Sequence, residues 1–428
     1  MIQPAVLPSL VYCDEAGNIH DFPDLGMAGM AHGRFLKPGP GDLIELPQGS
    51  DFFTLPNRLP VGIDPVSGEP LLLEEDPRYP GRKIYGVAAF MAPAHTSTLT
   101  AAYQTEENAP LLPLFAYTAV GWYDGKFWAA GFRSDADCRQ DFTQFDQHRI
   151  DRSTNQRLQR HQDNRLIQHL GTCCLTYRCP AARNYFLGRW EAPLPTSPTC
   201  NARCLGCISL QPSECCPSTQ ERLQFTPSVK EIVEVGVAHL NSAESPVVSF
   251  GQGCEGEPLL QTELLENSIR EMRKRTARGT INCNTNASLP SAIERLREAG
   301  LDSIRVSINS ARETYYHNYY RPRNYSFSDV KESIKAMKQS GGFVSLNYFI
   351  LPGFTDSMEE TSAFLELIEE TGPDFIQLRN LNIDPEWYLR EIGSTTALPS
   401  YTIRNWLEMI KQRFPALRFG YYNPCLNP

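Results

Sequence analysis

Three closely spaced cysteines carry the clearest chemical signal in this sequence of 428 residues. Cys200, Cys204 and Cys207 follow a C-x3-C-x2-C pattern within one short stretch, so their thiolates can face a single point. Thiolates are soft ligands that suit zinc or an iron–sulfur cluster. A closed structural zinc site takes four ligands, whereas a cubane cluster held by three thiolates leaves one iron open to a small ligand. The spacing alone leaves three alternatives: such a cluster, a zinc site completed elsewhere, or three buried thiols.

The elements that must position these cysteines follow a regular pattern from Trp190 onward. Short apolar runs predict one strand that ends at Leu194 and further strands at 247–250, 280–283, 304–308, 343–351 and 375–378. Segments of helical period between them predict helices at 228–240, 260–277, 289–299, 326–339 and 359–370. This alternation is typical of repeated βαβ units with a parallel sheet. The predicted fold class is α/β, an incomplete parallel (β/α)6 barrel, with an open doubly wound sheet as the alternative.

Polar motifs occur where the predicted strands end. The second strand is followed by GQGCEGEPL (251–259) and the third by NTNA (284–287), while SINS (307–310) lies on the fourth and LPGFTD (351–356) follows the fifth. In a parallel β/α barrel the functional groups lie at the C-terminal ends of the strands. The cysteine loop, which follows the first strand, fits the same rule.

This ordered set of motifs resembles the radical S-adenosylmethionine (radical SAM) superfamily over roughly residues 190–385. The resemblance implies an enzyme with a [4Fe–4S] cluster on Cys200, Cys204 and Cys207, whose open iron takes the amino nitrogen and carboxylate of S-adenosylmethionine. It also implies a one-electron donor such as flavodoxin or ferredoxin, cleavage of the cofactor to a 5′-deoxyadenosyl radical, and hydrogen abstraction from a substrate. The molybdopterin-type cyclases, the peptide-modifying enzymes and the wybutosine tRNA-base enzymes look most similar. The resemblance names no subfamily and no catalytic residue; a peptide, protein or small metabolite is the expected substrate, with an RNA base as the alternative.

The resemblance further implies where the cofactor binds. Gly256, Glu257 and Pro258 match the end of the family's Gly-Gly-Glu-Pro motif, whose Glu meets the cofactor amino group in a charge-assisted hydrogen bond. An acid that stabilises a helix N-terminus is the alternative role for Glu257. The other implied contacts, to the ribose, the adenine and the carboxylate, are Gly206, Asn286, Ser307, Asn309, Arg321 and Gly353. Ordinary polar lining is the alternative for Ser307 and Asn309, and a surface position beside a proline is the alternative for Arg321.

Two positions depart from the family pattern. Gly206 stands where an aromatic residue usually precedes the third cysteine, so only its backbone is left to meet the adenine. Glu255 replaces the first glycine of the Gly-Gly-Glu-Pro motif. It places a second carboxylate beside Glu257, and we expect this carboxylate to turn toward the substrate or into solvent.

Further cysteines lie near the triad in the sequence. They are Cys173, Cys174, Cys179, Cys215, Cys216 and Cys254. Because iron–sulfur clusters are usually held by four cysteines, this set can supply a second cluster. The predicted auxiliary ligands are Cys174, Cys179, Cys216 and Cys254. Buried structural thiols are the alternative, since unpaired cysteines often behave as buried hydrophobes.

The rest of the sequence divides into segments of different composition. Residues 1–132 are rich in proline, glycine and aromatic residues and predict an irregular, mostly β domain with a hairpin turn at Asp124-Gly125. Residues 133–189 predict a polar helical linker, which consists of one solvated helix and a cysteine-containing segment after it. Residues 190–390 are assigned to the partial barrel and residues 391–428 to a C-terminal helix and tail. The linker is rich in arginine, which would suit RNA, although most charge runs are solvated faces.

Composition and charge argue against several function classes. The net charge is −9, from 40 Lys+Arg against 49 Asp+Glu, which disfavours a broad nucleic-acid-binding surface. No run of 18 apolar residues occurs and the N-terminus lacks the pattern of a secretory signal, so we expect a cytoplasmic protein without a membrane partner. The 13 cysteines, an odd number, then favour metal or redox chemistry over a disulfide scaffold. A noncatalytic zinc-binding interaction protein is the alternative from another class.

Overall fold

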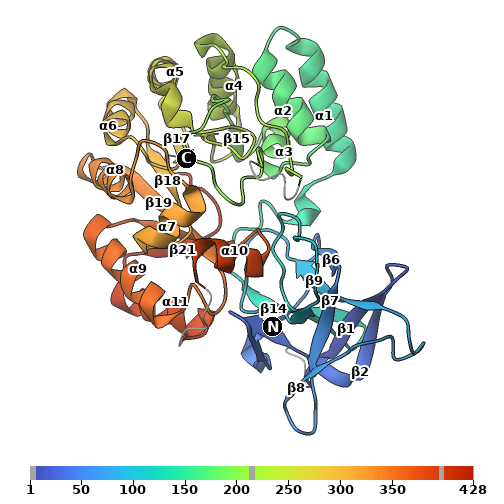
Figure 1. Cartoon of the computed structure of the whole chain (residues 1–428). Coiled ribbons are helices and arrows are strands. Elements are labelled where there is room, and N and C mark those ends of the chain that lie inside the picture. Colours follow the sequence, from blue (N-terminus) through green and yellow to red (C-terminus); the bar gives the residue numbers. More distant parts are fainter. Residues whose placement is uncertain (1–5, 212–216, 395–399, 428) are drawn as a thin grey trace. The chain divides into compact units, whose positions relative to one another are not determined.

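The chain folds into two compact units, each built from several stretches of sequence (Figure 1). The computed structural model describes residues 6–211, 217–394 and 400–427. The first unit comprises Met1–Ala136, Phe349–Ala363 and Leu378–Pro415, and the second comprises Asp137–Tyr348, Phe364–Gln377 and Ala416–Pro428. The cysteine triad and most of the barrel strands therefore belong to the second unit.

The first unit is built on antiparallel strands, which confirms the predicted β character of the N-terminal domain. The strands are β1 (Ser9–Asp14), β2 (Ile19–Met27), β3 (Gly29–Ala31), β4 (Arg34–Leu36), β5 (Leu43–Glu45), β6 (Asp51–Leu55), β7 (Arg58–Ile63), β8 (Pro70–Leu72), β9 (Ile84–Phe90), β10 (His95–Ser97), β11 (Thr100–Ala101), β12 (Tyr103–Thr105), β13 (Val120–Tyr123) and β14 (Lys126–Arg133). The main sheet runs β10-β14-β13-β1-β2-β7-β12; β5 joins at β14, β8 at β7, and β9 pairs with β1 and β6. Strands β11, β3 and β4 form a small separate sheet.

The predicted turn at Asp124-Gly125 joins β13 to β14. Tyr123 pairs with Lys126 across the turn, and Asp124 and Gly125 have φ values of 49° and 73°. Two successive positive φ values give the turn that matches the twist of the flanking strands, and glycine accepts this conformation without a steric penalty. The hairpin is therefore confirmed.

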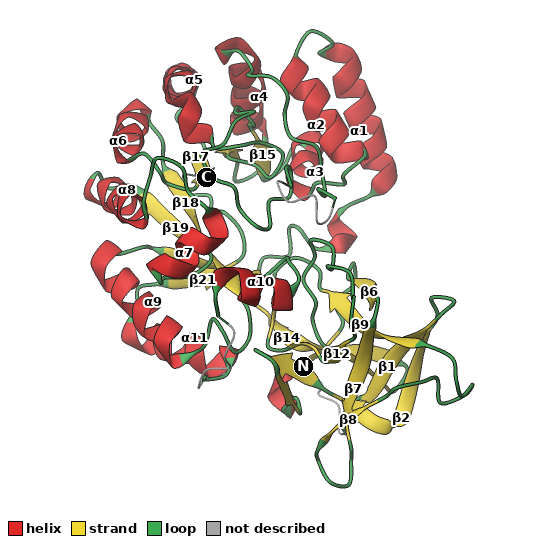
Figure 2. Cartoon of the chain, in the orientation of Figure 1, coloured by secondary structure: helices red, strands yellow, loops and turns green. Residues whose placement is uncertain are grey.

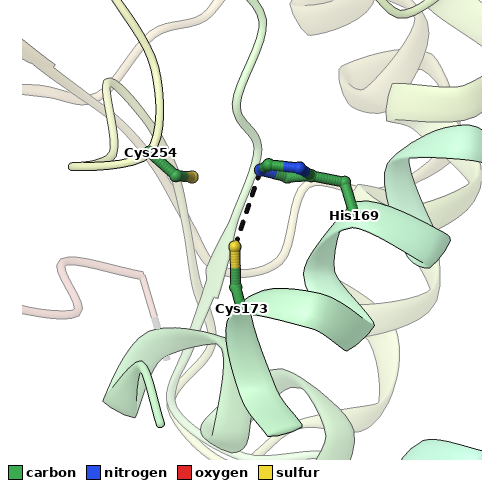
Figure 3. Close-up of side chains that lie close together, drawn as sticks. All are labelled: His169, Cys173 and Cys254. Carbon is green, nitrogen blue, oxygen red and sulfur yellow. Dashed lines mark hydrogen bonds between the residues drawn. The ribbon is translucent and has the colours of Figure 1, made fainter. Parts of the chain in front are cut away.

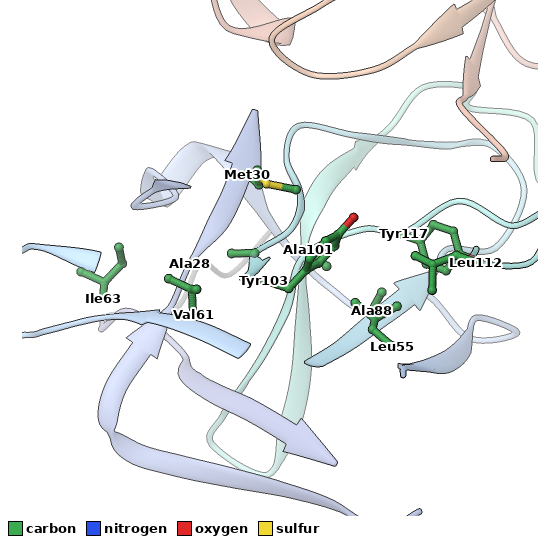
Figure 4. Close-up of a cluster of buried hydrophobic side chains, with 11 residues drawn as sticks. Ala28, Met30, Leu55, Val61, Ile63, Ala88, Ala101, Tyr103, Leu112 and Tyr117 are labelled. Carbon is green, nitrogen blue, oxygen red and sulfur yellow. The ribbon is translucent and has the colours of Figure 1, made fainter. Parts of the chain in front are cut away.

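Apolar side chains from several strands form a core in the first unit (Figure 4). Leu55, Val61 and Ile63 are almost fully buried there. Arg58 is buried as well, and its Nη2 lies 2.7 Å from Asp384 Oδ2 in the same unit. The pairing matters because taking an unpaired ion out of water costs several kcal/mol.

The second unit contains a curled parallel sheet of seven strands (Figure 2). In their order across the sheet the strands are β15 (Glu191–Pro193), β16 (Val247–Phe250), β17 (Thr280–Thr285), β18 (Ser303–Ile308), β19 (Phe343–Ile350), β20 (Phe375–Asn380) and β21 (Arg418–Gly420). The predicted incomplete parallel barrel is confirmed, and the structure adds β21 as a seventh strand. With three residues, β21 is too short to produce a recognisable apolar run.

Helices connect successive strands of this sheet, and local signals set their ends. The helices of the described chain are α1 (Gln147–Arg160), α2 (Arg165–Leu175), α3 (Pro180–Leu187), α4 (Val229–Ser242), α5 (Thr262–Arg275), α6 (Pro290–Ala299), α7 (Glu313–Tyr320), α8 (Phe327–Gln339), α9 (Met358–Thr371), α10 (Pro385–Ile392) and α11 (Ile403–Arg413), with short 3-10 helices at Pro40–Asp42, Phe142–Gln144 and Pro258–Gln261. Helices α4, α5, α6 and α8 lie side by side outside the strands (Figure 2). Ser228 begins α4 and Ser326 begins α8, each in a capping box with an acid three residues later. None of the helices in the described ranges is both long and apolar enough to cross a membrane.

The segment before the first barrel strand differs from the single solvated helix that we expected. It forms three helices, and α2 buries Leu166, Ile167 and Leu170. Helix α2 packs against α4, and α3 packs against β15. The polar composition therefore describes only the outer faces of these helices, while their apolar faces belong to the second unit's core.

The C-terminal tail crosses the starting ends of the strands. Gly279 N, just before β17, donates to Asn427 O at 2.8 Å. Asn423 Nδ2 donates to Glu191 Oε1 of β15 at 2.9 Å, and Gln377 Nε2 of β20 donates to Asn423 Oδ1 at 2.9 Å. The tail thus joins the edge strand β15 to β20, which lies next to the other edge strand, and the polar motifs lie at the opposite, C-terminal ends of the strands.

Candidate functional site

The three cysteines lie in an irregular loop after β15. Arg203 N donates to Tyr320 O at 2.9 Å, which ties the loop to the end of α7. Arg323 N donates to Asn201 O at 2.8 Å. The loop is therefore held by residues that follow β18, three strands away in the sheet. The three cysteine side chains are each half-buried.

The glycine-rich loop after β16 runs directly against the cysteine loop. Gly256 N donates to Ser197 O at 2.6 Å, and Glu257 N donates to Thr199 O at 2.8 Å. A Cβ at Gly256 would lie 1.9 Å from Thr199 O, so only glycine fits at this position. The motif thus brings the carboxylate of Glu257 and the thiols of the triad onto two loops in backbone contact.

Glu257 is buried, with 4% of its surface exposed. Its Oε1 accepts from Leu259 N at 3.0 Å and from Thr285 Oγ1 at 2.5 Å, and its Oε2 accepts from Asn286 N at 2.8 Å. The hydrogen bond from Leu259 N makes Glu257 the N-cap of the 3-10 helix Pro258–Gln261. The alternative role of Glu257, as an acid at a helix N-terminus, is therefore present in the structure. A carboxylate offers about four acceptor positions, and these three bonds leave one on Oε2. Burial raises the pKa of Glu257 to about 7.

Glu255 does not turn toward substrate or solvent, and that expectation is wrong. Its Oε2 accepts from the N and Oγ1 of Thr196 and from Ser197 N, and its Oε1 accepts from Gly251 N and Gln252 N, at 2.6–3.1 Å. With 5% of its surface exposed, the side chain is buried among these five donors. Glu255 therefore fastens the glycine-rich loop to the start of the cysteine loop. Sequence reasoning missed this because the donors are mostly backbone groups brought together by the fold.

Asn286 links the same two loops from the end of β17. Its N donates to Glu257 Oε2, and its Nδ2 donates to Asn201 Oδ1 at 2.8 Å. Asn201 in turn donates to Ser288 Oγ at 2.9 Å. The residue is placed within the network around Glu257, which fits the cofactor contact implied for it.

The remaining implied contacts lie on or after β18. Ser307 is at the C-terminal end of that strand and pairs with Asn347 of β19. Asn309 follows the strand, is buried, and donates its Nδ2 to Tyr315 O at 3.1 Å. Arg321 ends α7 with a φ of 48°. These positions lie at the same ends of the strands as the two loops, as a cofactor site across the barrel mouth requires.

Gly206 and Gly353 have different surroundings. Gly206 is buried between the second and third cysteines. Gly353 belongs to the first unit, where it has a φ of 84° and a Cβ would lie 2.7 Å from Ala31 C. Close packing within that unit therefore accounts for the glycine, and its implied approach to adenine stays a prediction.

Arg222 also belongs to the site, although no sequence motif indicates this. Its Nη2 lies 3.3 Å from Cys207 Sγ, and its Nε donates to Ser209 Oγ at 3.2 Å. A guanidinium donor stabilises a thiolate. Burial, followed by the charge of Glu257, raises the pKa of Cys200 to about 11, and burial raises the pKa of Cys204 as well. A bound cationic group would hold these sulfurs as thiolates, since a coordinating thiol loses its proton outright.

A second group of ligand atoms lies beside the glycine-rich loop (Figure 3). His169 and Cys173 project from α2, and Cys254 projects from the loop toward them. One ligand atom from each lies within 4.8 Å of the others. A hydrogen bond from the Cys254 thiol lowers the pKa of Cys173.

Only one of the predicted auxiliary ligands, Cys254, belongs to this group. Cys174 turns to Thr154, with 3.4 Å between Sγ and Oγ1. Cys179 is the residue at which α3 begins. Cys216 lies outside the described residues. The structure thus brings the neighbouring Cys173, together with a histidine, to Cys254.

The motifs and their geometry agree with a family comparison. The model of the radical SAM superfamily matches residues 194–365. The chain contains a radical SAM domain. Such a domain implies a [4Fe–4S] cluster and S-adenosylmethionine, and the residues of this radical SAM domain fit both groups. The loop offers three thiols and no fourth in its C-x3-C-x2-C pattern, and Glu257 keeps one acceptor position for an amino group.

Individual relatives cover only parts of the chain. The GTP 3′,8-cyclase of Paenarthrobacter nicotinovorans is 28% identical over 198 residues, which are 45% of this chain and 52% of that protein. The FeMo cofactor biosynthesis protein NifB of Klebsiella pneumoniae is 24% identical over 178 residues, 38% of each chain. The solved structure of native anSMEcpe with bound AdoMet has 17% identity and a TM-score of 0.40, over 54% of this chain and 63% of that one. The matched radical SAM region thus spans about half or less of each curated relative.

Proposed function

We propose that this protein is a radical SAM enzyme in which Cys200, Cys204 and Cys207 hold a [4Fe–4S] cluster and Glu257 accepts a hydrogen bond from the amino group of S-adenosylmethionine. The observation that carries the proposal is the backbone contact between the cysteine loop and the glycine-rich loop, through Gly256 N and Glu257 N. This contact places a buried carboxylate with one unused acceptor position beside a loop of three thiols. When bound, the cluster and cofactor supply a 5′-deoxyadenosyl radical that abstracts hydrogen from a substrate.

The spacing of the thiols favours a cluster over a single zinc ion. Ligands that share one zinc lie within about 4 Å of one another, because zinc–ligand bonds are about 2.0–2.3 Å long. Of the residues in the described ranges, only His169, Cys173 and Cys254 bring three His, Cys, Asp or Glu ligand atoms within 4.8 Å of one another. The triad's sulfurs are spread more widely, as ligands of separate irons would be. The zinc-binding interaction protein therefore has less support.

Other side chains of the domain would act by positioning. Arg222 holds Cys207 Sγ through a charged donor, and hydrogen bonds to cluster sulfurs tune the reduction potential. Asn286 fixes the cysteine loop relative to Glu257. Ser307 and Asn309 are suited to ribose hydroxyls because hydroxyl and amide groups both donate and accept. The electron comes from a separate one-electron donor, such as a flavodoxin or a ferredoxin.

The substrate that we propose is a peptide, a protein or a small metabolite. Two of the arginines that suggested RNA have partners within the protein. Arg157 donates to Tyr185 O at 3.0 Å and lies 4.5 Å from the centre of its ring. Arg165 pairs with Glu231 at 2.8 Å. An RNA base therefore gains no support from these two arginines.

The proposed function is tested by anaerobic purification and iron–sulfide reconstitution, followed by reduction in the presence of S-adenosylmethionine. We expect a visible thiolate-to-iron absorption, about four irons on the triad, and 5′-deoxyadenosine as a product. Cys138→Ala, which removes an exposed cysteine outside the triad, should behave like the parent. A colourless protein that binds zinc at the triad and forms no 5′-deoxyadenosine would refute the proposal.

A further inference from the structure

His169, Cys173 and Cys254 form a compact set of metal-ligand atoms outside the cysteine triad (Figure 3). His169 and Cys173 are four residues apart on α2, so both side chains lie on one face of the helix. Cys254 approaches from the loop after β16. Both thiols are buried and the imidazole is half-buried. Phe225 packs edge-on against the imidazole, with 6.4 Å between ring centres, and limits its rotation.

The distances in this set match those around one tetrahedral ion. Zinc lies about 2.3 Å from a cysteine sulfur and about 2.0–2.1 Å from a histidine nitrogen, which at a tetrahedral angle separates the two ligand atoms by about 3.6 Å. The observed distance from His169 Nε2 to Cys173 Sγ is 3.5 Å. Cys254 Sγ lies within 4.8 Å of both, and a small side-chain rotation would complete the set. Ligands of different irons in a cubane lie farther apart than this.

We propose that His169, Cys173 and Cys254 bind a single zinc-type metal ion at a site distinct from the triad. Two thiolates and an imidazole are the soft and borderline donors that zinc prefers, and three protein ligands leave the fourth position to water. The ion would join α2 to the loop that carries Glu255, Gly256 and Glu257. The site thus fixes the glycine-rich loop to α2, in addition to the contact of this loop with the cysteine loop, and it does not depend on the proposed radical chemistry.

The first test uses cobalt as a spectroscopic substitute for zinc. In the full-length chain with Cys200→Ala, Cys204→Ala and Cys207→Ala, the triad cannot contribute ligands. Metal-free, reduced protein should then bind about one cobalt ion, with the ligand-field bands of a tetrahedral site and thiolate-to-cobalt charge transfer. Added zinc should displace the cobalt and bleach both features. If the triad-free chain gives no tetrahedral, thiolate-ligated cobalt, the proposal is overturned.

Ligand variants in the same background identify the site. Cys173→Ser and Cys254→Ser should each weaken cobalt binding by more than the roughly 10-fold that loss of an outer-shell partner costs. Cys174→Ser is the matched control, because Cys174 is the adjacent buried cysteine of α2 and contacts Thr154 instead. It should bind cobalt as the triad-free chain does, and an equal loss in this control would contradict the assignment.

One further measurement decides the outcome where a variant does not fold, and a second distinguishes a zinc ion from a second cluster. X-ray absorption at the zinc edge of the otherwise unaltered chain, with its cluster assembled and zinc added, should show two sulfur ligands at about 2.3 Å and the remainder nitrogen or oxygen. A chain that takes up no zinc under these conditions overturns the proposal. Iron–sulfide reconstitution of the triad-free chain gives the other outcome: uptake of about four irons with a cubane spectrum would establish a second cluster in place of a mononuclear site.

Discussion

The substitution Glu257→Gln separates the two roles of this side chain, helix cap and partner of the cofactor amino group. Glutamine has nearly the same shape, and its Oε1 can still accept from Leu259 N and Thr285 Oγ1. Its amide nitrogen, however, replaces the oxygen that accepts from Asn286 N. Two donors then face each other, and the negatively charged acceptor that would meet the cofactor amino group is absent.

The substitution should lower both the free energy of unfolding and the affinity for the cofactor. A buried Asn286 N without an acceptor costs about 1–3 kcal/mol of the free energy of unfolding. The missing charge-assisted bond between the carboxylate and the cofactor amino group costs about 1.5–3 kcal/mol of binding free energy. The second figure corresponds to a Kd for S-adenosylmethionine that is roughly 10- to 150-fold higher. The cluster should be retained, because Glu257 supplies none of its three ligands.

The assay compares three proteins after anaerobic reconstitution. Iron content and visible absorption report the cluster, thermal unfolding reports the fold, and calorimetric titration with S-adenosylmethionine reports affinity. Glu263→Gln is the matched control, because it makes the same change at an exposed acid in the first turn of α5. We expect the control to bind the cofactor like the parent. A Glu257→Gln protein that melts at a lower temperature yet binds S-adenosylmethionine as tightly as the parent would show that Glu257 has a structural role alone.

Four further outcomes are expected. Cys204→Ala should lose the visible absorption and 5′-deoxyadenosine formation, because two thiolates are too few to hold the cluster; wild-type product formation would contradict the triad. Gly256→Ala should weaken cofactor binding and lower the melting temperature, since its Cβ would lie 1.9 Å from Thr199 O, and unchanged calorimetry would argue against the loop contact. Arg222→Ala should lower the cluster's reduction potential by roughly tens of millivolts in a redox titration, because a cation beside Cys207 favours the reduced, more negative state. Burial raises the pKa of Glu257 to about 7, so cofactor affinity should increase as the pH rises through 7 and the carboxyl group ionises. The Glu257→Gln variant should show no such increase. If the affinity of the parent is as independent of pH as that of the variant, Glu257 does not bind the cofactor.

Much of the fold was predictable because its signals are local. The apolar run Val247–Phe250 becomes β16, and the Ser228 capping box starts α4 at the predicted place. The elements that escaped prediction are stabilised by distant partners. The strand Arg418–Gly420 exists because its backbone pairs with β20, and its own three residues carry too little pattern to reveal it. Similarly, α2 lies at the end of a segment of polar composition, and only the fold shows that its apolar face packs against α4.

The site also contains some residues that the sequence predicts and others that only the fold brings together. The triad and the Gly-Glu-Pro stretch are each contiguous in sequence, so the amino-acid order alone displays their spacing. Arg222 and His169 belong to no such stretch, because each reaches its cysteine through the fold. His169 and Cys173 do have the i, i+4 spacing of two ligands on one helix face, a signal that could have favoured Cys173 over Cys174. The third ligand, Cys254, is 81 residues after Cys173, so only the folded chain could complete the set.

Glu255 departs from the family pattern, and the different contacts that successive residues of the loop 251–258 make explain this departure. Cys254 points to α2, Gly256 touches the backbone of the cysteine loop, and Glu257 faces the end of β17. Glu255 is buried between these contacts and satisfies five donors of the two loops at once. A glycine there would leave those donors to water, which a buried position admits only with room and polar partners. The extra carboxylate therefore has a structural role, and the two acids, close together in the motif, have different tasks because their donors differ.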